Sequence, residues 1–161
     1  MRAQISIEVA LMTGLAILVI VSLVNVQFER FSLARELGEA GEAKMIGTLI
    51  AGAINNAYAN GKGFQVYLSE EQVNFTRLGE AEKMYGLGVS LPIIINNTAR
   101  EIVIAKNMSK TGGSFWNVTV PIIPNNVVRL NPSAEYPELT VRNNGTNILI
   151  YADAAHINTV G

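Results

Sequence analysis

The feature that most constrains this chain is a run of 20 residues without a charged side chain, from Val9 to Phe28. An apolar helix of about 20 residues is long enough to cross the roughly 30 Å hydrocarbon core of a bilayer. The rest of the chain has the composition of an ordinary globular protein. The sequence therefore predicts one membrane-compatible segment and one soluble part.

Composition excludes several kinds of site in this chain of 161 residues. Its 12 basic and 13 acidic residues nearly balance and do not cluster, which argues against nucleic-acid binding. Because cysteine is absent, disulfides, thiol nucleophiles and cysteine-ligated metals are excluded. Asp153 and His156 lie three residues apart, but no further ligand accompanies them. We therefore expect no catalytic residue, no metal, no cofactor and no enzyme activity.

The first 60 residues predict one long α-helix. No proline occurs there, and after Arg30 apolar residues recur at helical spacing. The helix is expected from Gln4 to about Ala57, and the Asn60-Gly61 and Lys62-Gly63 pairs are expected to end it. The later part of this helix has one apolar face, which consists of Ile46, Leu49, Ile50, Ala53, Ile54 and Ala57.

Small residues inside the expected helix fall into two groups. Ala10 and Gly14 have the four-residue spacing that lets helix backbones approach each other closely, and so do Ala43, Gly47 and Ala51. Gly38 and Gly41 fit a different interpretation, because each glycine weakens a helix by about 1 kcal/mol relative to alanine. We expect packing from the first group and local softening from the second.

Beyond Gly63 the chain has short β-rich runs separated by turn residues. The expected strands are Phe64–Leu68, Gln72–Arg77, Val89–Ile95, Glu101–Lys106, Phe115–Ile123, Val127–Leu130, Glu138–Arg142 and Asn147–Ala152. This number of strands predicts an antiparallel β-sandwich of immunoglobulin-like size, with a small barrel as the alternative. The expected fold class is α+β, with a leader at residues 1–3, a helix at 4–60 and a β-rich domain at 61–161.

Four interpretations of the first 30 residues differ in how they account for Glu8. A cleaved secretory signal needs a shorter apolar run and a small-x-small site at its end, which is absent here. A plain anchor leaves a costly carboxylate unexplained unless it lies at the headgroups, and a buried core helix would be shorter. Cleavage between Ala3 and Gln4 instead places Glu8 one helical turn from the new α-amine.

Gln4, Ser6 and Glu8 stand at alternate positions at the head of the apolar run, and Met12 follows four residues after Glu8. This pattern resembles the class III signal-peptide motif of archaeal type IV pilin precursors. That motif is Gln-x-Ser-x-Glu, followed by three residues and Leu, at the start of an apolar run. Gln4, Ser6 and Glu8 match it, and Met12 occupies the Leu position. The leader Met1-Arg2-Ala3 is similar in length, although the family often has Lys-Gly before the cut. A helix followed by a β-rich domain is also similar to what archaeal pilins show.

The resemblance implies a structural subunit of an archaeal type IV-like adhesion pilus. Its implied partners are a prepilin peptidase that cuts between Ala3 and Gln4, the pilus assembly machinery, and further copies of the chain. The protein would cross the cytoplasmic membrane once before assembly and then join an extracellular helical filament with the apolar helices as its core. Two alternatives stay open: a membrane-tethered monomeric surface domain that binds a ligand, and an archaellum filament subunit.

The β-rich part carries more Asn-x-Ser/Thr sequons than its composition predicts. About two would occur by chance from the numbers of Asn, Ser and Thr. Five are present, at Asn74, Asn96, Asn107, Asn117 and Asn144. We therefore expect N-glycosylation of a surface outside the cytoplasm.

Overall fold

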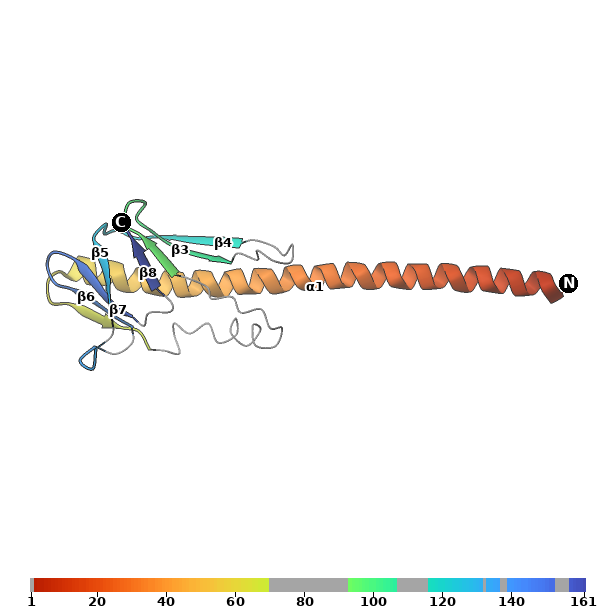
Figure 1. Cartoon of the computed structure of the whole chain (residues 1–161), viewed down its shortest axis with the longest axis horizontal. Coiled ribbons are helices and arrows are strands. Elements are labelled where there is room, and N and C mark those ends of the chain that lie inside the picture. The colour runs from red at the N-terminus through yellow and green to blue at the C-terminus, as the bar shows by residue number, and fades with distance from the viewer. Residues whose placement is uncertain (1, 70–92, 107–115, 132, 137–138, 153–156) are drawn as a thin grey trace. The chain divides into compact units, whose positions relative to one another are not determined.

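The computed structural model describes residues 2–69, 93–106, 116–131, 133–136, 139–152 and 157–161 (Figure 1). The chain divides into two compact units, Met1–Gly38 and Glu39–Gly161. In the described residues the first unit is helix alone, and the second contains the rest of that helix and every strand. The boundary therefore lies inside the helix, whereas the sequence placed the start of the β-rich domain at residue 61.

The long helix is confirmed as α1 (Arg2–Asn60), a continuous element of 59 residues. It begins at Arg2, so its backbone includes two of the three residues assigned to a leader. The helix ends where expected, because Gly61 and Gly63 have φ values of 81° and 92°. Such positive φ values favour glycine and cannot continue a right-handed helix.

Eight short strands follow α1 in the described residues. They are β1 (Gln65–Tyr67), β2 (Ile93–Asn96), β3 (Glu101–Lys106), β4 (Trp116–Pro121), β5 (Val127–Leu130), β6 (Leu139–Asn143), β7 (Ile148–Ala152) and β8 (Ile157–Val160). All but β8 overlap strands expected from the sequence, and β3 and β5 have the expected bounds. The expected strand at Gln72–Arg77 lies outside the described residues. A long helix followed by strands confirms the α+β class.

The strands form two four-stranded sheets, which we name sheet 1 (order β1-β6-β7-β5) and sheet 2 (order β4-β3-β2-β8). The expectation of antiparallel strands throughout is wrong, because β5 pairs with β7 and β2 pairs with β8 in parallel. The first parallel pair arises because β6 lies on the far side of β7, so the connection from β5 to β6 must cross β7. The immunoglobulin-like arrangement is not confirmed.

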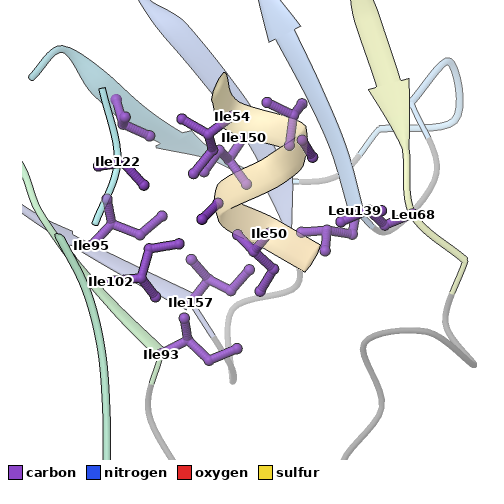
Figure 2. Close-up of a cluster of buried hydrophobic side chains, with 14 of the residues drawn as sticks. Ile50, Ile54, Leu68, Ile93, Ile95, Ile102, Ile122, Leu139, Ile150 and Ile157 are labelled. Atoms are coloured by element: carbon purple, nitrogen blue, oxygen red, sulfur yellow. The ribbon is translucent and has the colours of Figure 1, made fainter. Parts of the chain in front are cut away.

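The core of the second unit is built around α1 (Figure 2). Ile50 and Ile54 are fully buried and belong to the same cluster as residues from both sheets. The buried helix positions cover an arc of about 160° at 100° per residue. These positions are Ala43, Ile46, Gly47, Ile50, Ala51, Ala53, Ile54 and Ala57. The helix therefore supplies part of the interior that a sandwich of two sheets would fill with strand side chains alone.

Alternation along the strands supplies the other side of this core. On β2 and β3 every second residue is a fully buried isoleucine, and the register pairs Ile93 with Ile104 and Ile95 with Ile102. Sheet 1 contributes further fully buried branched side chains, from Ile148 and Ile150 of β7 and Val141 of β6. Branched side chains fit the pleated face of a sheet, which explains why these runs form strands around the helix.

The small residues Ala43, Gly47 and Ala51 are all buried in the core of the second unit, and Gly47 lies against sheet 2. A Cβ atom added at Gly47 would lie 3.0 Å from Val120 Cγ2 and 3.4 Å from Ile104 Cδ1. A side chain there would press on Val120 of β4, while Ile104 of β3 would be in ordinary contact. Gly47 therefore allows a close approach of the helix to sheet 2 within the chain.

Polar side chains join the two sheets to each other and to the helix end. Asn97 receives a hydrogen bond from Val127 N (3.1 Å) and donates one to Val127 O (2.9 Å), linking the turn after β2 to β5. Asn143 is buried and donates from Nδ2 to Ala57 O at 3.0 Å, near the C-terminal end of α1. Its Oδ1 accepts from Gly145 N at 2.7 Å. One side chain thus connects the helix end to the turn between β6 and β7.

Candidate functional site

The apolar segment of α1, Ile7–Phe31, is the largest candidate for a functional surface. This segment of 25 residues is long and apolar enough to span a membrane, and none of it is buried within the chain. Its exposed side chains lie on every side of the helix, among them Met12 at 76% and Ile20 at 59% exposure. A helix that is apolar all round is stable only when lipid or protein covers it. Nothing among the described residues covers this segment, so we expect lipid or another protein to cover it.

Two hydroxyl groups within this segment are satisfied locally. Thr13 Oγ1 donates to Val9 O at 2.8 Å, and Ser22 Oγ donates to Leu18 O at 2.9 Å. Both bonds run back one helical turn, so neither hydroxyl needs water or a partner side chain. The segment can therefore enter an apolar environment without leaving these hydroxyl donors unpaired.

The residues of the signal-peptide motif lie on the first turns of α1. Ala3, Gln4 and Ser6 belong to the helical backbone, and Glu8 and Met12 have exposed side chains. Four-residue spacing puts positions 4, 8 and 12 on one side of the helix. Among the described residues Glu8 has no hydrogen bond and no ion pair. Its exposed carboxylate therefore lies at the start of the apolar segment with no partner among the described residues.

The sequons fall into three settings. Asn144 is exposed in the turn between β6 and β7, Asn117 is exposed on β4, and Asn96 is half-buried at the end of β2. Asn74 and Asn107 lie outside the described residues, as do Asp153 and His156. In the part of the chain that the structure describes, no group of three or more His, Cys, Asp or Glu side chains lies close enough to hold a metal.

Comparisons with protein-family models, with curated proteins and with solved structures found no match to this chain. Function can therefore be inferred only from the residues of this chain and their arrangement. The motif positions, the exposed apolar segment and the uncompensated Glu8 lie together at the N-terminal end of α1, and the sequons lie on the second unit.

Asn143 is a structural residue that the sequence did not single out. The run Asn143-Asn144-Gly145 indicates a turn, which is what forms, but nothing in it distinguishes the buried first asparagine from the exposed second one. The signal was the position of Asn143 at the end of an alternating run, where it continues the inward face of Leu139 and Val141. A polar residue on an inward face is expected to have a buried partner.

Proposed function

We propose that this protein is the structural subunit of an archaeal type IV-like adhesion pilus, made as a precursor and polymerised through α1 after cleavage between Ala3 and Gln4. The observation that carries the proposal is the apolar segment Ile7–Phe31, which overlaps a signal-peptide-like motif and is not covered by the described residues. Lipid would cover it before assembly, and the same segment of neighbouring copies would cover it in the filament.

Glu8 favours a filament over a permanent membrane tether. A carboxylate near the head of a membrane segment is unfavourable, so a tether gains nothing from retaining it. In a filament whose subunits begin at Gln4, Glu8 of one chain lies within reach of an α-amine in its own or a neighbouring chain. Losing a buried partner of this kind costs about 1–3 kcal/mol at each subunit contact. Repeated along a polymer, that loss suppresses assembly.

The second unit supports the same proposal by being complete without the apolar segment. Its core contains helix positions from Ala43 to Ala57 and strands of both sheets, and no residue of Ile7–Phe31 belongs to it. A subunit that moves from lipid into a filament must exchange the cover of its apolar segment while its outer domain stays folded. That exchange is possible because the core of the second unit contains no residue of the apolar segment.

The test replaces Glu8 and follows processing, membrane insertion and filament yield in the native host. We expect Glu8→Gln and Glu8→Leu chains to be cut and inserted, with fewer filaments, and with the larger loss for Leu. Glu29→Gln is the matched control, because it removes an exposed carboxylate at the other end of the same segment. Peptide mass mapping of assembled material should find Gln4 as the first residue.

Three results would contradict the proposal. Intact Met1 in assembled filaments would remove the processing step. Wild-type filament yield from Glu8→Leu chains would remove the need for a compensated charge and would favour the membrane-tethered surface domain, for which leucine is at least as acceptable as glutamate. Recovery of the chain in motility filaments would favour the archaellum alternative.

A further inference from the structure

The turn between β6 and β7 holds Asn144 in a conformation unlike those of the other described sequon asparagines. Asn144 Oδ1 accepts hydrogen bonds from Thr146 N at 2.9 Å and from Asn147 N at 2.7 Å. Asn144 N also donates to Asn147 O at 3.1 Å. The amide oxygen of the acceptor residue is therefore held by the backbone of its own sequon.

The surroundings of this turn fix it further. Gly145 has a φ of 97°, and its N–H donates to Oδ1 of the buried Asn143. Asn126 Nδ2 donates to Thr146 O from the neighbouring loop. Asn144, Gly145 and Thr146 are nevertheless exposed. The turn is thus rigid and open to solvent at the same time.

From this geometry we infer that Asn144 is the principal N-glycosylation acceptor among the described sequons, and that it receives an oligosaccharide from a lipid-phosphate-linked donor. In this reaction Asn144 Nδ2 forms a bond to C1 of the first sugar, and the bond between C1 and the donor phosphate oxygen breaks. The lipid phosphate leaves with the bonding electron pair, and the amide proton passes to a base of the transferase.

The two hydrogen bonds to Oδ1 assist that reaction. An amide nitrogen is a poor nucleophile because its lone pair is delocalised onto the carbonyl oxygen. As the Nδ2 proton leaves, negative charge develops on Oδ1, where the N–H groups of Thr146 and Asn147 already point. Donors preorganised at a position of developing charge stabilise the transition state.

The other described sequons lack this combination. Asn117 is exposed, but it lies within β4, whose backbone is paired with β3 at Ala105. Asn96 is half-buried, its Oδ1 accepts one bond from Ala99 N at 3.0 Å, and the adjacent Asn97 holds β5. Used sequons are typically found in surface loops, and of these three only Asn144 is both exposed and in a turn.

The experiment measures site occupancy by glycopeptide mass spectrometry on the full chain purified from native membranes. We expect the Asn144 peptide to carry a glycan and to be more fully occupied than the Asn117 and Asn96 peptides. Asn144→Gln and Thr146→Val should each lose that glycan mass. Thr146→Ser retains the sequon and should keep it.

Two substitutions at Gly145 distinguish the effect of the turn conformation on glycosylation from the effect of the sequon itself. Both leave the Asn-x-Thr sequon intact. At a φ of 97° any side chain is strained, and an added Cβ would lie 3.0 Å from Lys62 Cδ, the outer part of a flexible side chain. The strain is smaller for Asn, which adopts positive φ more readily than a β-branched Val. We therefore expect Gly145→Asn to keep more of the glycan than Gly145→Val, with Trp116 fluorescence confirming that both chains are folded. Equal occupancy in the two variants would overturn the role of the turn.

An unmodified Asn144 in native material would overturn the assignment itself, whether or not other asparagines carry glycans. The inference requires only that the second unit lies outside the cytoplasm and does not require a filament. Its failure would therefore leave the proposed pilus function standing, and failure of filament assembly would leave the glycan assignment standing.

Discussion

The two parts of α1 have different relations to the rest of the chain, although they belong to one continuous helix. Ile20 in the apolar segment is 59% exposed, whereas Ile54 in the second unit is fully buried. An isoleucine on this helix is thus exposed in the apolar segment and part of the core in the second unit. Hydrophobicity predicts that both regions of the helix pack against other apolar groups. In the described residues the strands after residue 60 pack only on the second region, around Ile54.

Small residues show the same contrast. Gly47 lies against Val120 and Ile104, so its missing side chain is required by packing. Gly14, Gly38, Gly41 and Gly52 have nothing within 4 Å of an added Cβ, so no contact in the chain explains them. Glycine in the buried stripe is a packing residue, and the glycines elsewhere in α1 are tolerated at a cost in helix stability.

Matched isoleucine truncations give the largest expected difference between the two regions. Ile54→Ala removes buried methyl groups and leaves a cavity between the sheets, so we expect it to lower the unfolding free energy of the second unit by about 2–5 kcal/mol. Ile20→Ala removes no contact of that unit and should change its stability by less than about 0.5 kcal/mol.

Urea unfolding of the full chain in mild detergent measures both effects. Trp116 is the single tryptophan and packs against the core, so its fluorescence reports on the second unit. Equal destabilisation by the two variants would mean that the apolar segment contributes to the core, and the proposed independence of the two units would be wrong.

Alanine substitution of two glycines should produce smaller effects of opposite sign. At Gly47 the new Cβ would press on Val120 at 3.0 Å, and overpacking of this kind destabilises by about 1–3 kcal/mol. At Gly52 the Cβ meets nothing, so the gain in helix propensity should stabilise the chain by about 1 kcal/mol. The same unfolding measurement checks both, and stabilisation by Gly47→Ala would show that β4 can move away from the helix.

The sequence predicted those features of the fold that depend on local patterns. The helix from Arg2 to Asn60 has no proline and ends at glycines with positive φ, and both signals are readable without a structure. Seven of the eight strands were expected because branched residues alternate between turn residues. The membrane-compatible segment is equally local, because its 20-residue uncharged run is continuous.

Features that depend on long-range pairing were not predicted. β8 has only four residues, Ile157–Val160, and its pairing partner β2 lies more than 60 positions earlier. No local signal specifies that pairing or its parallel direction. The contact of Gly47 with sheet 2 was likewise hidden, because small residues at four-residue spacing fit a helix or a sheet equally well. The candidate site was predictable because its residues are adjacent in sequence.

Polar contacts provide the last difference between the regions. In the apolar segment Thr13 and Ser22 bond within one helical turn. In sheet 1 the connection that crosses β7 is held by a longer-range contact, in which Tyr136 stacks on Tyr151 with ring centroids 4.2 Å apart. Arg142 of β6 donates from Nη1 to the Tyr136 hydroxyl. These contacts join the connection to β7, which it crosses, and to β6, which it enters.

Titration of Tyr136 should reveal that contact as a small, pH-dependent contribution to stability. Burial raises the pKa of Tyr136 above the usual tyrosine value of 10.0, while Arg142 acts in the opposite direction. The folded state therefore holds the Tyr136 proton more tightly than the unfolded state. The contribution of this group to stability is fully present below pH 10.0 and is lost as the pH rises through the raised folded pKa.

Tyr136→Phe keeps the stacking but cannot titrate. We expect the urea midpoint of the wild type to fall more steeply above pH 10.0 than that of Tyr136→Phe, while the remaining tyrosines affect both alike. Parallel decline of the two proteins would mean that the hydroxyl is as well solvated in the fold as in the unfolded chain, and that stacking alone holds the connection on β7.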